Sequence, residues 1–155
     1  MERGAAQRSL FRRWPAGVSV LVAETDGRRA GLTVSSLVSL SLDPPLVAVS
    51  IARDASIHEP LRDAGAWSAS LLAGDQEALA QHFARSVPPI ALWNGIPVRD
   101  DDPALIVGAA GWLRARTIEQ VATGDHTLFV GEVEWLEEGT AADSLVYAHR
   151  TYHAL

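Results

Sequence analysis

Hydrophobic and polar residues alternate over short stretches along much of the chain, which is the two-residue period of a half-buried β-strand. Stretches that follow or approach this pattern are residues 18–22, 30–42, 67–73, 104–117 and 128–136. Residues 46–51 are apolar at nearly every position, as in a strand that is buried on both faces. The pattern predicts a mainly β protein.

Helical segments are few and short. One is predicted within residues 1–13, a second over residues 56–64 with Ser56 as its N-cap, and a third from Asp75 to about residue 85. Many short strands joined mostly by tight turns, with few helices, favour a closed antiparallel barrel over parallel βαβ units.

Two segments have no regular pattern. Residues 87–103 hold four of the eight prolines and an Asp-Asp-Asp run, and they predict a long irregular loop of the kind that often binds or covers a ligand. The tail, residues 145–155, fits a helix or an extended segment equally well. No repeat divides the sequence, and residues 1–155 are therefore expected to form a single domain.

Composition removes several classes of function. With a formal net charge of −6 the chain is a poor candidate for non-specific nucleic-acid binding, which needs a basic face. The absence of cysteine excludes disulfides, thiolate catalysis and cysteine-ligated zinc. The first residues lack the apolar core of a signal peptide, and no apolar run is long enough to span a membrane. We expect a cytoplasmic protein that binds neither nucleic acid nor membrane.

Polar residues inside the strand pattern are the first candidates for chemistry. Thr33, Ser35 and Ser36 either form a solvent-facing strand surface or supply hydrogen bonds to a flat heteroaromatic ring. Arg53 follows the apolar strand 46–51. It is either a surface residue or a ligand for a phosphate, whose geometry a guanidinium matches.

The histidines are weaker candidates. His126 lies between an aspartate and a strand, where it is either structural or functional. His149 and His153 are four residues apart but have no carboxylate in register, so no metal site is expected. The common motifs for phosphate binding and hydrolysis, including the Rossmann G-x-G-x-x-G, are absent from the sequence.

Three blocks of sequence resemble the flavin reductase-like family, whose members are FMN-binding split barrels. Residues 11–20 read F-R-R-W-P-A-G-V-S-V, residues 31–46 read G-L-T-V-S-S-L-V-S-L-S-L-D-P-P-L, and residues 124–133 read G-D-H-T-L-F-V-G-E-V. They are similar, in the same order, to the family's F-x-x-x-P-x-G-V-x-V, G-x-T-x-S-S-x-x-S-x-S-x-x-P-P-L and G-D-H-x-x-x-x-G-x-V. The resemblance covers nearly the whole chain and implies an antiparallel Greek-key split β-barrel.

The resemblance also implies roles for individual residues. The residues it assigns to the flavin ring, its side chain or the border of the cofactor are Thr33, Val34, Ser35, Ser36, Ser50, Ile51, Gln76 and Phe83. Arg53 falls where a basic residue meets the flavin phosphate, and His126 falls near the nicotinamide. Arg150 and Tyr152 match a C-terminal R-x-Y that closes the site, commonly across a dimer interface.

The implied activity is an NAD(P)H-dependent flavin reductase. It passes a hydride from NADH or NADPH to FMN, with FAD as the other possible flavin, and it supplies reduced flavin to a partner monooxygenase. A homodimer is expected. Hydride transfer requires no proton to be abstracted, so His126 is assigned a positioning role. A flavin-binding module without activity and a flavin-dependent oxidoreductase for a small organic substrate are the alternatives.

The chain departs from the family pattern at three positions. Leu37 stands where an aromatic residue is usual, Ser70 where asparagine is usual, and Val34 where alanine is common. These side chains border the expected flavin site, so the departures concern ring placement and flavin affinity rather than the fold.

Overall fold

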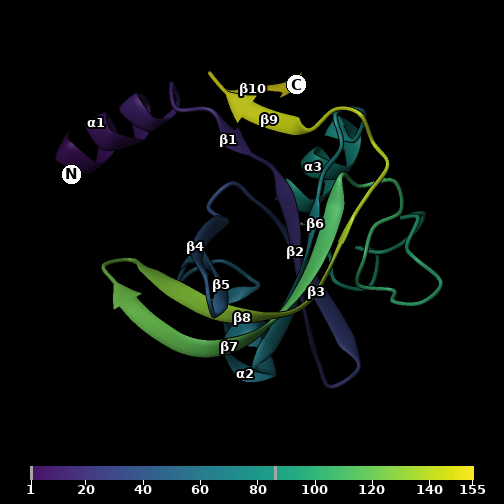
Figure 1. Cartoon of the computed structure of the whole chain (residues 1–155). Helices are drawn as coiled ribbons and strands as arrows, with labels where there is room; N and C mark the ends of the chain where they lie inside the picture. The colour runs from purple at the N-terminus through teal and green to yellow at the C-terminus, as the bar shows by residue number, and fades with distance from the viewer. Residues whose placement is uncertain (1, 86) are drawn as a thin grey trace.

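The computed structural model describes residues 2–85 and 87–155, in which there are three short helices and ten strands (Figure 1). In chain order the elements are α1 (Glu2–Phe11), β1 (Ala16–Gly17), β2 (Ser19–Thr25), β3 (Arg28–Val34), β4 (Val38–Leu42), β5 (Pro45–Ala52), α2 (His58–Ala64), β6 (Ala66–Leu71), α3 (Glu77–Ala84), β7 (Gly111–Thr123), β8 (His126–Glu138), β9 (Leu145–Ala148) and β10 (Thr151–Ala154). The expected mainly β fold is confirmed.

Seven strands form one antiparallel sheet in the order β3-β2-β6-β7-β8-β5-β4. Its two edge strands, β3 and β4, follow each other in the sequence and are joined by residues 35–37 alone. The sheet therefore curls back on itself, yet no ladder among the described residues closes it between β3 and β4. This is the split antiparallel barrel that the sequence predicted.

The interior of the barrel holds the main hydrophobic core. Its largest members are Leu21, Ile51, Leu61, Trp67 and Phe129, and Leu61 comes from α2, which packs against β2.

One glycine is needed inside this core. A Cβ on Gly131 would lie only 3.0 Å from the Trp67 ring and 2.8 Å from the Cβ of Ala115. The indole of Trp67 packs directly against the β8 backbone, so a larger residue at position 131 would displace it.

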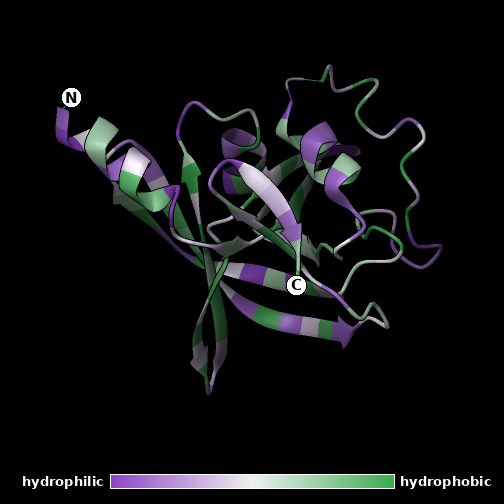
Figure 2. Ribbon diagram, turned by 90° about the horizontal axis from the view of Figure 1, so that it is seen from above, coloured by the Kyte–Doolittle hydropathy of each residue, from purple (hydrophilic) through white to green (hydrophobic). Residues whose placement is uncertain are grey.

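A second core lies on the outside of the barrel, where α3 covers β2 and β3. Val20 and Val22 point outward from β2 and meet Phe83 of α3, which is fully buried. The Phe83 ring rests on Gly31 of β3, where a Cβ would approach it to 2.9 Å. In Figure 2, hydrophobic and hydrophilic residues alternate along several strands, as expected for strands with two different environments.

Two predicted helix starts are wrong. Helix α2 begins at His58 without a capping side chain, so Ser56 is not its N-cap. Helix α3 begins at Glu77, and Asp75 does not cap it either. In both cases the residues before the helix form turns whose backbone hydrogen bonds take the place of a side-chain cap.

Two predicted strand regions also need correction. The predicted strand 104–117 begins only at Gly111, because residues 104–106 are buried in a loop that pairs Val98 with Ile106. The ambiguous tail forms the β9–β10 hairpin, which pairs with β1. The apolar residues of both segments are thus buried outside the main sheet.

Candidate functional site

The split beside β3 and β5 brings two predicted site segments together. The Ser36 hydroxyl donates to the carbonyl of Ser50 at 2.8 Å and accepts from its backbone N–H at 3.1 Å. Ser36 therefore ties the end of β3 to β5. Thr33 donates to the carbonyl of Ala80 at 2.6 Å and ties β3 to α3. Both hydroxyls already have internal partners, whereas Ser35 is exposed.

Arg53 and His126 meet at the ends of β5 and β8. The backbone N–H of Arg53 donates to the carbonyl of Asp125 at 3.0 Å, and Ala52 is the ladder partner of His126. The Arg53 side chain is exposed. The structure thus places the predicted phosphate ligand beside the predicted nicotinamide residue, although the two are far apart in the sequence.

Asp125 fixes the ring of His126. Its carboxylate lies 2.7 Å from His126 Nδ1 and can only accept a hydrogen bond, so Nδ1 carries the proton. This hydrogen bond holds the pKa of the Asp125 carboxyl below its usual range. The other ring nitrogen of His126, Nε2, has no protein partner among the residues that the structure describes.

Strand alternation decides which predicted residues share a face. Ile51 and Phe129 point into the barrel, so Ser50 on β5 and His126 on β8 point outward. Ser50 and His126 therefore lie on one outer surface of the sheet. The side chains of Val34 and Ile51 belong to the inner core instead, which leaves only their backbone groups near the split.

Gln76 and Phe83 have structural partners. The Gln76 side chain accepts from the N–H of Ala73 and donates to the carbonyl of Val107, both at 2.9 Å, so its amide is used on both sides. The ring centre of Phe83 lies 5.1 Å from that of Trp93, and Phe83 also lines a cleft on this side of the barrel.

That cleft runs along the free edge of β3 and has a volume of about 990 Å³. One wall is β3 between Arg28 and Leu32, directly before Thr33. The facing wall is residues 54–56, directly after Arg53. The cleft therefore continues the split, beginning where the predicted flavin segments end.

Arg150 and Tyr152 lie in the β9–β10 hairpin. His149 and Arg150 form its turn with φ of 53° and 62°, a left-handed conformation that is uncommon for residues other than glycine. The ring centre of Tyr152 lies 4.9 Å from that of Tyr147, and burial raises the pKa of the Tyr152 hydroxyl. Within the described chain, no hydrogen bond or ion pair joins this hairpin to the predicted flavin segments of β3 and β5.

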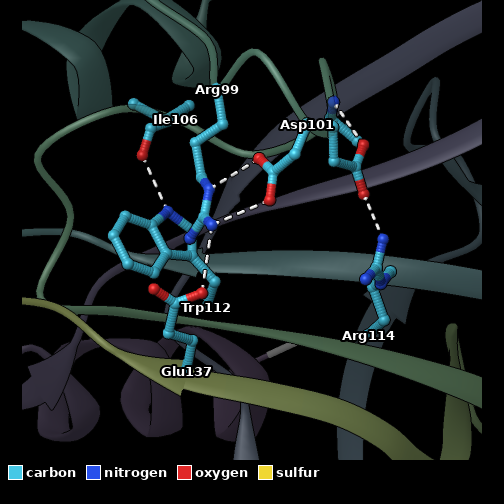
Figure 3. Close-up of polar contacts among 8 residues, drawn as sticks. Arg99, Asp101, Ile106, Trp112, Arg114 and Glu137 are labelled. Atoms are coloured by element: carbon cyan, nitrogen blue, oxygen red, sulfur yellow. Dashed lines mark hydrogen bonds and ion pairs between the residues drawn. The ribbon is translucent and has the colours of Figure 1, made fainter.

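A cluster that the sequence analysis missed anchors the second half of the long loop (Figure 3). Arg99 pairs with Asp101 at 2.9 Å and with Glu137 at 3.0 Å. Its guanidinium lies 4.5 Å from the centre of the Trp112 ring. The loop is therefore held to β7 and β8 by charge and by an aromatic ring.

A second ion pair completes this anchor. Arg114 of β7 pairs with Asp102 at 2.8 Å, beside the Arg99 contacts (Figure 3). The Asp-Asp-Asp run and the preceding Arg99 were visible in the sequence, but Arg114 lies 12 residues beyond Asp102 and gave no local signal.

Metal binding and membrane crossing are two further possibilities for the described residues. In residues 2–85 and 87–155, no three His, Asp or Glu side chains gather as a metal ion would require. None of the helices in the same residues is both long and apolar enough to cross a membrane.

The split antiparallel barrel matches the fold of solved flavin reductases. The family model for the flavin reductase like domain matches residues 11–155. The chain belongs to the flavin reductase-like family.

Known relatives are similar in sequence to this chain over nearly its full length. The chain is 37% identical over 151 residues to the reductase component of 4-hydroxyphenylacetate 3-monooxygenase of Thermus thermophilus, covering 97% of this chain and 95% of that protein. It is 34% identical to an NADH:FMN oxidoreductase of Rhodococcus qingshengii, over 94% of this chain and 79% of that protein.

Solved structures of flavin reductases also superpose on this chain over nearly its full length. BorF, the flavin reductase component of a bacterial two-component tryptophan halogenase, superposes with a TM-score of 0.88 at 30% identity over 98% of both chains. The NADH:FAD oxidoreductase SgcE6 of Streptomyces globisporus, in complex with NAD and FAD fragments, superposes with a TM-score of 0.90 at 27% identity, over 99% of this chain and 93% of that one.

Proposed function

We propose that this protein is an NAD(P)H-dependent flavin reductase that passes a hydride from a reduced nicotinamide to FMN, with FAD as the other possible flavin. The observation that carries the proposal is the convergence of Arg53, Ser50 and His126 at the outer ends of β5 and β8, beside an open cleft. The chemistry supplied by the flavin is acceptance of a hydride at N5 from C4 of the nicotinamide.

The residues at the split fit a flavin mononucleotide. Arg53 offers an exposed guanidinium that can bind a phosphate through two hydrogen bonds. Ser35 offers an exposed hydroxyl, and Ser36 holds the backbone of Ser50 in place for the ring. Rigid backbone on both sides of the split keeps the bound ring in one orientation, which is the main requirement for a transfer between two stacked rings.

His126 is proposed to position the nicotinamide. Asp125 keeps the proton on Nδ1, so Nε2 of the neutral ring is an acceptor on the outer surface. An amide N–H of the nicotinamide carboxamide is a suitable donor for it. Hydride transfer needs no general base, and loss of this one hydrogen bond is expected to raise the KM for NADH several-fold.

A second copy of the chain is proposed to cover the outer surface that carries Ser50 and His126. Val38 is 47% exposed and Val121 is 39% exposed on this side of the sheet. Helix α1 buries none of its own residues and projects from the body of the molecule (Figure 1). So short a helix is marginal in water without a packing partner. A homodimer supplies that partner and brings in the R-x-Y hairpin, β9–β10, from the neighbouring subunit.

The reduced flavin is proposed to serve a partner monooxygenase. This role is supported by the Thermus thermophilus relative, which is the reductase component of such a system. We further propose that residues 1–155 act as one domain in the cytoplasm.

The test is oxidation of NADH by the purified protein with FMN, followed by the loss of nicotinamide absorbance. Turnover that depends on both compounds is expected for the wild-type chain. His126→Ala should raise the KM for NADH several-fold while FMN affinity stays near that of wild type. Absence of FMN-dependent oxidation would overturn the proposed activity, and an unchanged KM in a folded variant would overturn the role of His126.

A further inference from the structure

Helix α2 is tied to the start of β8 by a side-chain hydrogen bond that the proposed function does not use. His58, the first residue of α2, places its Nε2 2.8 Å from the hydroxyl of Thr127. A histidine nitrogen and a hydroxyl can each donate or accept, so this hydrogen bond forms with either neutral form of the ring. Thr127 is buried and directly follows His126. The hydrogen bond therefore joins α2 to β8 beside the proposed nicotinamide residue.

Packing also fixes the ring of His58. Its centre lies 5.6 Å from the ring centre of Phe129, in an edge-to-face arrangement with an angle of 67° between the planes. Phe129 is fully buried in the barrel core, and so is Ile57, the residue directly before His58. The imidazole is thus held at the entrance of the chain into the core, where it faces Thr127.

The turn that carries Arg53 is attached to β8 and the turn before it at both of its ends. At the start, the N–H of Arg53 donates to the carbonyl of Asp125 at 3.0 Å. At the end, the ring of His58 meets Thr127. Residues 53–58 therefore form a short loop that is closed at each end by a hydrogen bond to neighbouring residues of the same hairpin.

Between these attachments the backbone is held by two turn hydrogen bonds. The N–H of Ala55 donates to the carbonyl of Ala52, and the N–H of His58 donates to the carbonyl of Ala55, both at 3.0 Å. The Arg53 side chain is exposed and forms no ion pair with any described residue. The direction of its guanidinium therefore depends on the backbone of the turn, and the turn depends on its attachments.

We propose that His58 is a positioning residue for the flavin phosphate. Through Thr127 it holds the second end of the turn, and the turn presents Arg53 to the phosphate. A binding group is fully effective only when the contacts around it hold it in the bound geometry. The inference rests on the proposed function, since Arg53 must meet the phosphate for His58 to act through it.

The test compares the affinities for FMN and for riboflavin, because only FMN carries the phosphate. His58→Ala and Thr127→Val each remove the hydrogen bond, and Thr127→Val does so with little change in side-chain volume. Each should weaken FMN binding by about fivefold while riboflavin binding stays near wild type. His58→Gln keeps a nitrogen at a similar reach and should restore the FMN affinity.

A double-mutant cycle tests whether the effect passes through Arg53. In an Arg53→Ala background, Thr127→Val should cause no further loss of FMN affinity, because the group that it helps to position is absent. Losses that add in the double variant would overturn the proposed action through Arg53.

His82→Ala is the matched control for a simple loss of stability. His82 is also a half-buried histidine of a helix, with Nε2 2.6 Å from the carbonyl of Leu92 and its ring edge-on to Phe83. It lies on α3, outside the turn that carries Arg53. This variant should lower the melting temperature and leave the ratio of FMN to riboflavin affinity at the wild-type value. The same change of ratio in His82→Ala and His58→Ala would overturn the inference, because the ratio would then follow stability.

The outcomes separate this inference from the proposed function. If Arg53→Ala lowers the ratio of FMN to riboflavin affinity but folded His58→Ala and Thr127→Val do not, His58 has no positioning role and the phosphate contact stands. Equal losses of FMN and riboflavin in these two variants would also overturn the inference, since the effect would not concern the phosphate. An unchanged ratio in Arg53→Ala would overturn the phosphate contact and this inference with it.

Discussion

The barrel has two outer surfaces with opposite character. Over β3, β2 and β6 the apolar side chains are covered by α3 and the loop that follows it, and Val20 and Phe83 are fully buried. Over β4 and β5 on the opposite outer surface Val38 is about half-exposed, and helix α1 lines a pocket with Asp125 and His126 without burying any residue of its own. Both surfaces arise from the same strand alternation, so the difference lies in what covers them.

The contrast divides the predicted site residues into two groups. Predicted site residues on the covered side, Thr33, Gln76 and Phe83, have internal partners. Those at the ends of β5 and β8, Arg53 and His126, keep their proposed ligand-binding atoms free of protein partners among the described residues. An open surface beside polar groups is typical of a surface that binds a ligand or another subunit.

Truncating one apolar residue on each surface tests this contrast most severely. Phe83→Ala removes a fully buried ring and is expected to lower the free energy of unfolding by about 3–5 kcal/mol. Val38→Ala is the matched change on the open surface and should cost the isolated subunit less than about 0.5 kcal/mol. Urea unfolding at low protein concentration measures both, and similar losses would show that the open surface is packed within one chain.

Ser36→Ala should cost about 1–3 kcal/mol in unfolding free energy, because the N–H and carbonyl of Ser50 lose their partner at the split. Ser35→Ala is the matched control, since the Ser35 side chain is exposed. Thermal melts of the two variants measure this difference in stability. Equal stability would mean that Ser36 does not tie β3 to β5.

Arg150→Gly changes a strained turn residue that is also a predicted site residue. Glycine adopts the left-handed turn at φ of 62° without steric cost. The variant should therefore be more stable by up to about 1 kcal/mol. If Arg150 closes the flavin site from the neighbouring subunit, the same variant should bind FMN more weakly. Calorimetry and a flavin titration on one preparation measure both effects, and a more stable variant with normal FMN binding would remove Arg150 from the site.

The smallest effect concerns the loop anchor at Arg99. The hydrogen bond from Arg99 lowers the pKa of Asp101, so the pair contributes stability above the ordinary aspartate pKa and loses it as pH falls through the lowered value. Both groups are solvent-accessible, and the contribution is accordingly modest. Asp101→Asn should therefore reduce amide protection in residues 99–106 at neutral pH, and the difference from wild type should vanish in acid.

Amide hydrogen exchange at the two pH values measures this effect. Asp100→Asn is the matched control, because Asp100 forms no ion pair with any described residue. Equal protection in the Asp100 and Asp101 variants at neutral pH would show that the Arg99–Asp101 pair does not anchor the loop.

The open side of the molecule could largely be predicted from the sequence. The apolar run 46–51 located the strand that carries Ser50, and the pattern over 128–136 located the strand of Phe129. The third sequence block contains His126, and Arg53 was predicted from its place directly after the apolar run. These residues are recognisable because strand period and motif spacing are local properties of the chain.

The barrel interior and the contacts between distant segments could be predicted less well. The interior role of the Val34 and Ile51 side chains depends on strand register, which one sequence leaves undetermined. The hydrogen bond from Gln76 to Val107 and the ion pair between Arg99 and Glu137 each join segments distant in the chain, so no local pattern could indicate them.

The most direct test of the open surface as the flavin site is titration of Arg53→Ala with FMN and with riboflavin, which lacks the phosphate. We expect FMN binding to weaken by about tenfold or more, the loss of a charge-assisted hydrogen bond, while riboflavin binding stays near wild type. Equal losses for the two ligands, or no loss for either, would contradict the placement of the phosphate at Arg53.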